Sequence, residues 1–471
     1  MPHTGTPQIS SAAILHKFGP VERSTLEALS VPKLLITQAT GYRFRGSREP
    51  YKLRKRKLVG AVIPYLAALA PQDWQITLVD DATEKIDFNG DYDIVAITIR
   101  TVTSLRGYEI ADKFRRRGKT VIMGGPHATF YSDEVAQHAD GVCIGEAEEI
   151  FPRMLEDAAA GKLQKFYRRD TPASLVGMPT PRWDLLDPKK YVWYRPYVIQ
   201  FSRGCPFICD FCAERRLNGD FGYRYRPVEE VVADIKRCGS KHIFFAASQF
   251  AGNVDNAMEL MEALIPLKIR WSTLFSAHYC LDQTFMDLAR RSGLLHVNMG
   301  IESINQKTLN KWSKGFNKTS EYARVVGNLK KRDISYSLNF VFGSDSDDET
   351  VFDATLQFLD QLKAETAYFN ILVPLRGTSL HQKFKEEDRL VDEENMERWP
   401  GLSCHFKPLR FSPDELVHRI TKIRHDFYTN GSAVRRLPVP YRQSHFAAWN
   451  LHFLQRKVVH NINSMRDFTE F

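Results

Sequence analysis

The sequence predicts an α/β protein with two successive strand–helix units and a mostly helical C-terminal part. Two series of short apolar runs alternate with helical patterns, over 31–165 and 196–375, and such alternation favours parallel sheets covered by helices. Asp170–Pro188 contains four prolines and separates the two series as an irregular connector. The expected parts are an N-terminal tail (1–30), a first domain (31–165), a linker (166–195), a second domain (196–375) and a C-terminal helical domain (376–471).

The composition is that of an ordinary globular protein. Its 471 residues are 43% hydrophobic and 26% charged, and a chain of this length has room for about two to four domains. Seven cysteines without a framework spacing argue against a secreted disulfide protein, so we expect a cytoplasmic location. We expect no transmembrane segment and no signal peptide, because no long apolar run occurs and Met1–Ser11 is polar.

The net charge of +9 is densest over Arg43–Lys57. Such a segment could meet nucleic acid, an anionic membrane surface or phosphate groups. The alternative, a solvated loop leading into a helix, is favoured. No sequence signature of a nucleic-acid-binding module accompanies the segment, so no nucleic-acid partner is expected.

The first domain is predicted to be a doubly wound parallel sheet. The predicted strands are 33–37, 74–80, 92–98, 120–123 and 141–145, and the predicted helices are 57–70, 107–117 and 133–138. In sheets of this kind, ligands bind beyond the carboxyl ends of the strands.

Glycines, threonines and a glutamate gather at three of these strand ends. Paired glycines let the backbone approach a large ligand closely, and threonine hydroxyls offer uncharged donors. Each motif is weak alone, because Gly-Gly-Pro is more often only a turn. Together they predict a ligand site, with Thr98, Thr101, Gly124, Gly125, Gly145 and Glu146 as its candidate residues.

The second domain repeats the strand–helix alternation. The predicted strands are 197–201, 242–245, 270–274, 295–301, 335–341 and 368–372, and the predicted helices are 228–237, 257–264, 282–291, 320–331 and 350–362.

In the C-terminal part, Ser412–Glu415 reads as a capping box that starts a helix. A final helix through Phe446–Lys457 carries an apolar stripe that could rest on a membrane, as a peripheral contact, or line an apolar pocket. Docking on the second domain is favoured.

Three cysteines, Cys205, Cys209 and Cys212, follow the first strand of the second domain at a CxxxCxxC spacing. Three thiolates can hold three irons of a four-iron (4Fe-4S) cluster and leave the fourth iron open to an outside ligand. A structural zinc site would need four protein ligands, and no second CxxC is present. Three idle thiols remain an alternative, but chance would rarely place three of seven cysteines in one loop.

CxxxCxxC with Phe211 before the last cysteine resembles the signature of the radical S-adenosylmethionine (radical SAM) enzymes. The resemblance implies a partial six-stranded barrel and a cluster whose open iron is chelated by S-adenosylmethionine (SAM). Reduction by an external donor such as flavodoxin or ferredoxin would then yield a 5′-deoxyadenosyl radical that abstracts hydrogen from a small-molecule substrate.

The strand ends of the first domain resemble those of the Rossmann-like cobalamin-binding domain that precedes the barrel in one large radical SAM class. The resemblance implies cobalamin as a third cofactor. Cobalamin domains of another type carry a cobalt-ligating histidine after the first strand, whereas Gln38–Arg43 contains none. We therefore expect that no protein histidine holds the lower face of the cobalt.

Two barrel motifs resemble SAM-binding segments of the family, and the end of the second strand departs from the family pattern. Glu302, in Gly-Ile-Glu-Ser, matches a motif near the ribose and carboxylate, although a plain helix-start glutamate is an alternative. Asn339 begins a fifth-strand motif beside the adenine, although an ordinary core strand is equally compatible. The second strand ends in Ala-Ser-Gln instead of Asp-Asp-Asn, so Ser248 and Gln249 are the candidates for hydrogen-bonding the methionine ammonium. In the sixth-strand motif, Arg376 replaces a proline.

The order of domains resembles that of hopanoid methylases and bacteriochlorophyll-pathway methylases. This resemblance implies a cobalamin-dependent C-methyltransferase that acts on an unactivated carbon of a lipid, a tetrapyrrole or another secondary metabolite. One alternative is a radical SAM cyclase or oxidoreductase, like the anaerobic magnesium-protoporphyrin ester cyclase. Another is a non-catalytic iron–sulfur binding protein. The sequence assigns no catalytic residue beyond the cofactor contacts.

Overall fold

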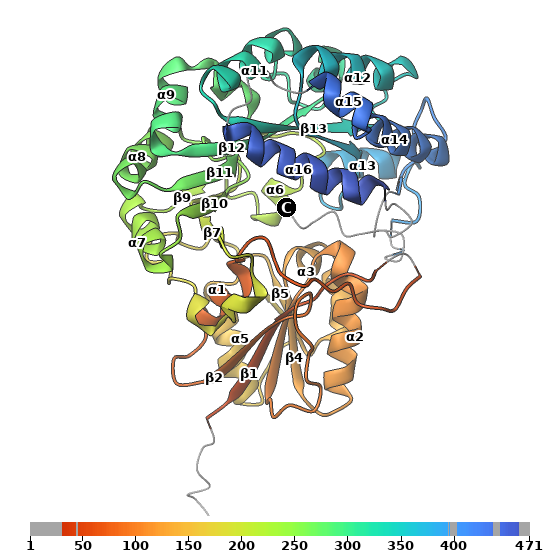
Figure 1. The fold of residues 1–471 in the computed structure, drawn as a ribbon. Coiled ribbons are helices and arrows are strands. Elements are labelled where there is room, and N and C mark those ends of the chain that lie inside the picture. The colour runs from red at the N-terminus through yellow and green to blue at the C-terminus, as the bar shows by residue number, and fades with distance from the viewer. Residues whose placement is uncertain (1–30, 44–45, 394, 396–402, 437–442, 461–471) are drawn as a thin grey trace, which may run out of the picture.

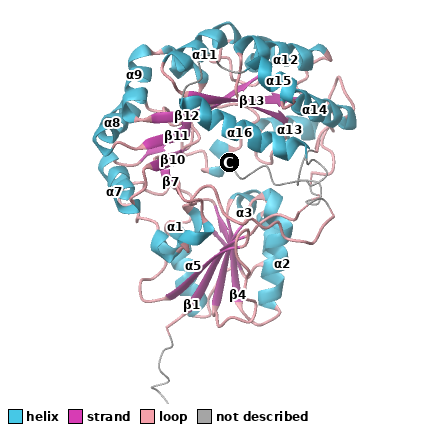
Figure 2. Ribbon diagram, viewed as in Figure 1, coloured by secondary structure: helices cyan, strands magenta, loops and turns pink. Residues whose placement is uncertain are grey.

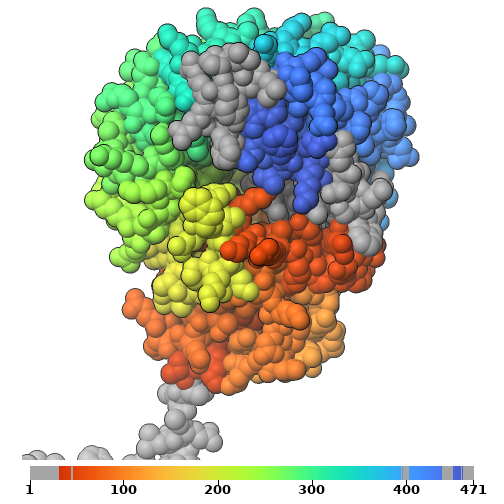
Figure 3. All heavy atoms as spheres, in the orientation of Figure 1, coloured from red at the N-terminus to blue at the C-terminus, as the bar shows by residue number. Residues whose placement is uncertain are grey.

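Two α/β bodies lie one above the other, and the C-terminal helices pack on the second (Figure 1). The structure, a computed structural model, describes residues 31–43, 46–393, 395, 403–436 and 443–460. In the space-filling view, the atoms of the first body, red to orange, meet the atoms of the rest of the chain (Figure 3).

The first body is a six-stranded parallel sheet with helices on both faces, as predicted. The strand order is β2-β1-β3-β4-β5-β6. Alternate residues face opposite sides, so Leu34 and Ile36 pack with α1 and α5, while Leu35 and Val95 pack with α2 to α4. The elements are β1 (Lys33–Gln38), α1 (Val62–Leu69), β2 (Gln75–Asp80), β3 (Ile94–Thr98), α2 (Ser104–Arg115), β4 (Thr120–Gly124), α3 (Pro126–Phe130), α4 (Ser132–His138), β5 (Gly141–Ile144), α5 (Ile150–Ala159) and β6 (Phe166–Arg168).

The second body is an open barrel of six parallel strands in chain order, with helices on its outer side (Figure 2). This arrangement confirms the predicted partial barrel. The elements are β7 (Tyr197–Gln200), α7 (Val228–Cys238), β10 (His242–Ala246), α8 (Val254–Leu264), β11 (Arg270–Leu274), α9 (Gln283–Ser292), β12 (Leu294–Glu302), α11 (Tyr322–Lys331), β13 (Ser335–Phe342), α12 (Thr350–Leu362) and β14 (Ala367–Ile371).

The two faces of the barrel wall differ in polarity. Val297 and Met299 of β12 pack in the hydrophobic core with the outer helices. Between them, Asn298 lies on the other face, where its Oδ1 accepts hydrogen bonds from Ser337 Oγ at 3.0 Å and Asn339 Nδ2 at 2.7 Å. The interior face thus carries hydrogen-bonding groups, which suits a barrel that holds polar ligands.

The predicted helix over 57–70 begins only at Val62. The preceding residues instead run beside the barrel, where Val59 N donates to Pro196 O at 2.8 Å and Val198 N donates to Val59 O at 3.0 Å. We call residues 56–59 the strap. It covers the free edge of β7, which would otherwise expose unpaired backbone groups.

The described residues of the basic segment form a loop, and some of their charges are paired. Arg56 forms a two-point ion pair with Asp80, at 2.6 and 2.8 Å, and Lys52 lies 2.9 Å from Asp81. Asp80 ends β2 and Asp81 follows it, so the segment is held to the end of that strand. The favoured interpretation as a loop is therefore confirmed, although not all of it is solvated.

Three elements of the first body were not predicted. Gly124-Gly125-Pro126 favours a turn where α3 begins, and the sequence predicts no element over α5. β6 pairs with β5 although it falls in the predicted linker. Short helices and edge strands carry too few periodic positions to show in one sequence.

The C-terminal helices are α13 (Ser379–Glu386), α14 (Pro413–Phe427), α15 (Asn430–Arg436) and α16 (Gln443–His460). Ser412 Oγ accepts a hydrogen bond from Glu415 N at 3.1 Å, so α14 begins where predicted. α16 contacts β12 and β13 and buries Trp449, whereas Phe453 is exposed. Docking of α16 on the barrel is confirmed by its contacts with β12 and β13, while the side chain of Phe446 lies outside the described residues. No helix among the described residues is long and apolar enough to cross a membrane.

Candidate active site

The cysteine loop is closed by a short two-stranded ribbon. β8 (Ser202–Arg203) pairs antiparallel with β9 (Arg224–Tyr225), so the loop over 204–223 leaves and returns at one place. Gly204 has a φ of +79°, and a Cβ there would lie 2.0 Å from Gly222 O. Only glycine permits this crossing.

Backbone hydrogen bonds and a ring contact hold the cysteine loop against Trp312 and Leu380. Asp210 N donates to Trp312 O at 3.2 Å, and Asp210 O accepts from Leu380 N at 3.0 Å. The ring of Phe211 packs edge-on against Trp312 with centroids 5.2 Å apart. The aromatic residue of the motif therefore anchors the loop.

The three cysteines differ in exposure. Cys205 and Cys209 are half-buried and Cys212 is exposed. Burial raises the pKa of Cys205 to about 11 and that of Cys209 to about 12. These thiols would stay protonated at neutral pH unless a bound metal replaced the proton.

In the described part of the chain, no three His, Cys, Asp or Glu side chains come together closely enough to hold one metal ion. A zinc ion would need all its ligands at one centre. In an iron–sulfur cluster each cysteine bonds a different iron, so the sulfurs are spread apart. The three thiols Cys205, Cys209 and Cys212 suit three irons of such a cluster.

A buried ion pair lies beside the cysteines. Lys314 Nζ donates to Glu302 Oε1 at 2.8 Å, and the two side chains are 10% and 9% exposed. Burial acts to lower the pKa of Lys314, but the carboxylate of Glu302 outweighs it and raises that pKa. Lys314 is thus a cation that faces the cysteine loop.

Glu302 sits in a special backbone position. It ends β12 at a register shift with β13 and has a φ of +60°. The helix-start alternative is wrong, because the next helix, α10 (Gln306–Lys311), begins only at Gln306. A non-glycine residue held in this conformation indicates local strain that the surroundings must stabilise.

The other predicted SAM contacts fare differently. Gln249 is buried, and its amide is bonded to Ser276, as donor at 2.6 Å to Oγ and as acceptor at 3.3 Å from N. Ser248 is exposed at the end of β10. Asn339 donates to Asn298 within the barrel. The structure leaves Ser248 open to a ligand and places Gln249 in a supporting position.

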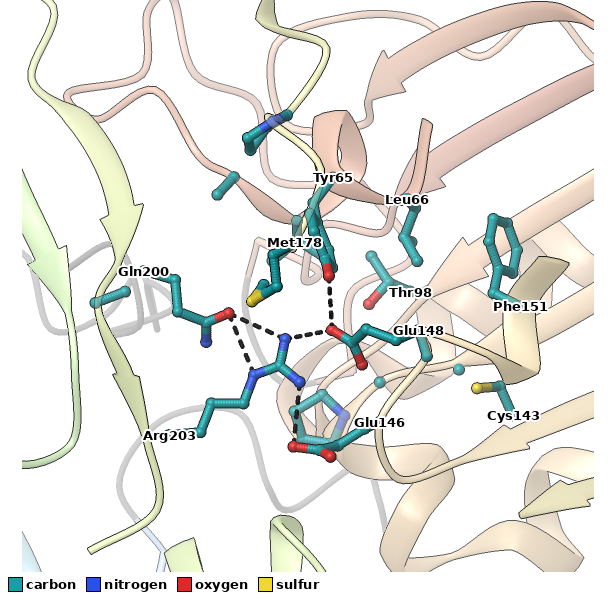
Figure 4. Close-up of a pocket in the computed structure, with 18 of the residues that line it drawn as sticks. Tyr65, Leu66, Thr98, Cys143, Glu146, Glu148, Phe151, Met178, Gln200 and Arg203 are labelled. Carbon is teal, nitrogen blue, oxygen red and sulfur yellow. Dashed lines mark hydrogen bonds and ion pairs between the residues drawn. The ribbon is translucent and has the colours of Figure 1, made fainter. Parts of the chain in front are cut away.

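At the meeting of the two sheets lies a cavity of about 360 Å³ (Figure 4). It extends from the barrel strands inward between α1 and β3 toward α5, and most of its wall is apolar. Five of the six ligand-site candidates in the first domain line it, namely Thr98, Gly124, Gly125, Gly145 and Glu146. The sixth, Thr101, instead has its Oγ1 3.2 Å from Nδ1 of the buried His127.

Two cavity glycines have positive φ for different reasons. A Cβ on Gly125, at φ +100°, would lie 2.7 Å from Ile99 O. Gly145, at φ +85°, has no atom within 4 Å of such a Cβ. Gly125 is needed for a close turn, while Gly145 leaves open space beside the cavity.

Glu146 and Glu148, from the loop after β5, face the barrel across the cavity. Glu146 accepts hydrogen bonds from Arg203 at 3.1 Å and from Ala173 N at 2.8 Å. Glu148 accepts from Tyr65 Oη at 2.9 Å and from Arg203 (Figure 4). The carboxylate that was predicted as a ligand contact thus joins the first domain to the barrel.

Arg376, which replaces a proline of the sixth-strand motif, makes a second contact between the bodies. Its guanidinium lies 4.4 Å from the ring centroid of Tyr131, at the end of α3. It also approaches Glu393 at 4.0 Å. The arginine that departs from the family motif thus forms a cation–π contact between the two bodies.

Sequence reasoning missed Lys314, Arg203 and Glu148. Lys314 follows a short helix in a loop where no motif marks it. Arg203 precedes the first cysteine and carried a visible signal, because a charged residue in a strand-to-loop turn needs a partner once buried.

Replacing Lys314 by Met should lower the free energy of unfolding by about 3–5 kcal/mol, because Glu302 would stay buried without its cation. Chemical denaturation of the apoprotein measures this loss. The matched control is Lys311→Met, at an exposed lysine of α10, which should change stability by less than about 0.5 kcal/mol. Adding Glu302→Gln to Lys314→Met should restore part of the loss. An equally unstable double variant would contradict the assignment.

Residues 199–359 match the model of the radical SAM superfamily. The chain is 30% identical over 385 residues to bacteriochlorophyllide d C-12(1)-methyltransferase of Chlorobaculum tepidum, covering 79% of this chain and 83% of that protein. It is 23% identical to the hopanoid C-2 methylase of Rhodopseudomonas palustris, covering 70% of this chain and 65% of the methylase.

Among solved structures, the fold is similar to that of the radical S-adenosylmethionine methyltransferase TsrM from Kitasatospora setae, solved with cobalamin and a [4Fe-4S] cluster. The TM-score is 0.66 at 16% identity, covering 92% of this chain and 99% of that one. At this identity the likeness shows the fold, including the order of the two α/β bodies.

Proposed function

We infer the function from one premise, that this chain belongs to the radical SAM superfamily. It is an enzyme, and membership brings a 4Fe-4S cluster and SAM. We propose that it is a cobalamin-dependent C-methyltransferase acting on an unactivated carbon of a small molecule. The observation that carries this proposal is the cavity, where the ligand-binding edge of a cobalamin-type sheet faces the cysteine loop of the barrel.

Cys205, Cys209 and Cys212 would bind three irons of the cluster. A cluster with three thiolates is an anion in a partly buried place, and Lys314 would stabilise it from below through its raised pKa and its fixed contact with Glu302. The ion pair with Glu302 would keep the Lys314 ammonium in place both before and after the cluster is reduced.

Ser248, Glu302 and Asn339 are the residues that we propose for SAM. Ser248 offers a hydroxyl at the end of β10, and Gln249 supports that turn through Ser276. Glu302 places a carboxylate at the end of β12, where it can contact the ribose or the methionine ammonium of SAM. Ser248 and Glu302 lie at the carboxyl ends of barrel strands, where ligands of such barrels bind, while Asn339 lies in the middle of β13.

The first-domain cavity fits a large cofactor in two respects. Gly145 leaves space that a side chain would fill. Glu148 Oε2 is buried, lines the cavity and has no hydrogen-bond partner among the described residues. A buried acceptor without a partner is costly, and the amide groups around a corrin ring are donors that would satisfy it. We propose that Thr98, Gly124, Gly125 and Gly145 also hold cobalamin.

When bound, the cluster and SAM supply a radical that takes hydrogen from carbon, and cobalamin supplies the methyl group. The protein contributes position, because the carboxyl ends of both sheets point at one space, and it limits water there by apolar lining. The electron donor would be external, such as flavodoxin or ferredoxin. We place the enzyme in the cytoplasm, where thiols stay reduced.

For the substrate, we propose a polycyclic molecule such as a tetrapyrrole or a hopanoid-like lipid. The similar proteins are named for bacteriochlorophyllide and hopanoid methylation.

The test is anaerobic reconstitution with iron, sulfide and cobalamin, followed by reduction with methyl-labelled SAM and candidate tetrapyrroles and hopanoids. The expected result is 5′-deoxyadenosine together with a labelled substrate. Deoxyadenosine with an unlabelled, cyclised or oxidised product would favour the cyclase alternative. A reconstituted cluster without deoxyadenosine would favour a non-catalytic iron–sulfur protein.

A further inference from the structure

We propose that Arg203 is a positioning residue that fixes the cysteine loop relative to the first domain. The inference rests on the proposed function, because its purpose is to set the cluster at a fixed place relative to cobalamin. We assign Arg203 no direct bond to either cofactor, although it forms part of the cavity wall. It acts through the carboxylates that it holds.

The contacts of Arg203 span the two bodies. It stands on β8, two residues before Cys205. Its Nη1 donates to Glu146 Oε1 at 3.1 Å and its Nη2 donates to Glu148, while Nε and Nη2 donate to Gln200 Oε1 at 3.2 and 3.0 Å. All three nitrogens are therefore used, and the planar guanidinium has one orientation.

The other end of the cysteine loop is tied to the same carboxylate. Arg224 on β9 is the register partner of Arg203. Its Nη2 donates to Glu146 Oε1 at 2.5 Å and its Nη1 donates to Ala173 O at 2.8 Å. Both strands of the ribbon thus hold Glu146, so the loop cannot shift without breaking ion pairs on each side.

The network is also anchored on the side of the first domain. Tyr65 of α1 donates to Glu148 at 2.9 Å, so the carboxylate is fixed from two directions (Figure 4). The side chains of Arg203, Glu146 and Glu148 are 12%, 8% and 11% exposed. Ion pairs this sheltered depend on geometry, and removing one partner leaves a buried charge.

The position of the network gives it its role. Arg203, Glu146 and Glu148 line the cavity assigned to cobalamin, and Arg203 leads directly into the first cluster ligand. Radical transfer and methyl transfer must meet at one carbon, and a misplacement of about 1 Å can cost about 10²-fold in rate. Loosening this network should therefore uncouple the two events.

The experiment compares full-length Arg203→Gln, reconstituted with cluster and cobalamin, with the wild type. We expect methylated product per 5′-deoxyadenosine to fall by about 10-fold or more, while iron and sulfide content stay as in the wild type. Arg203→Lys keeps the charge but can reach only one carboxylate. Its yield of methylated product per 5′-deoxyadenosine should therefore lie between those of the wild type and Arg203→Gln. Hydrogen exchange over residues 145–149 and 204–223 should be faster in Arg203→Gln, with or without cofactors.

The matched control is Arg324→Gln. Arg324 pairs with Glu321 at 2.9 Å on one exposed helix turn, so the product ratio and the exchange rates should be those of the wild type. If Arg203→Gln does not fold, Arg203→Lys alone is judged by the same ratio, because it keeps the charge and gives up one of the two carboxylates.

An unchanged product ratio in the variant that folds would overturn the proposal. Equal losses of deoxyadenosine and methylated product at full iron content would also overturn it, because they would show a general defect. A wild type that forms no deoxyadenosine would instead refute the proposed function, so the two failures can be told apart.

Discussion

Replacing Cys205, Cys209 and Cys212 together by Ala should abolish 5′-deoxyadenosine formation, a loss of more than about 10³-fold. The cluster would lose its protein ligands, and SAM would lose the iron that binds its methionine end. The measurement is deoxyadenosine after anaerobic reconstitution and reduction, with iron content determined on the same samples. Single replacements should each lose most of the activity, because the three thiols act as one unit.

Cys238→Ala is the matched control. Cys238 is half-buried at the end of α7 and bonds only locally, with its Sγ donating to Ile235 O at 3.3 Å. It should retain both iron and deoxyadenosine formation. Deoxyadenosine formation by the triple variant at the wild-type rate would refute the cluster assignment.

Replacing Leu66 by Trp should weaken cobalamin binding while the cluster stays intact. Leu66 lies on α1 and lines the cavity, so the larger side chain would occupy space meant for the cofactor. Overfilling of this kind costs about 1–3 kcal/mol, which corresponds to about a ten- to hundredfold weaker affinity. Titration followed by cobalamin absorbance measures it. Methyl transfer should fall with occupancy, while deoxyadenosine should still form.

Leu69→Trp serves as the control, because Leu69 is on the same helix and packs in the same core but does not line the cavity. It should bind cobalamin as the wild type does. Equal affinities in Leu66→Trp and the wild type would mean that cobalamin, if bound, does not enter this cavity.

Sequence reasoning worked where a local pattern determines the structure. The alternating apolar runs set the strands of both sheets, and Ser412 set the start of α14, because periodicity and caps act over a few residues. The loop of Cys205 was visible for the same reason, since its ligands are close in the chain.

What sequence reasoning missed depends on contacts between distant segments. Nothing near Glu146 shows that its carboxylate would meet Arg203 and Arg224, which come from another body. Nor does the Ala-Ser-Gln turn reveal that the side-chain amide of Gln249 is hydrogen-bonded to Ser276. The sequence predicts helix from residue 57 onward, but Val59 of the strap pairs with Tyr197, which lies far along the chain, and tertiary pairing overrides local preference.

The strap has a consequence for how the chain reaches its native state. Val59 and Tyr197 are far apart in sequence, and closing such a loop costs chain entropy before the pairing can repay it. The barrel therefore completes its first edge only after the N-terminal body has been brought to it, which slows assembly. A barrel made without that body would present an open strand edge to other copies and aggregate.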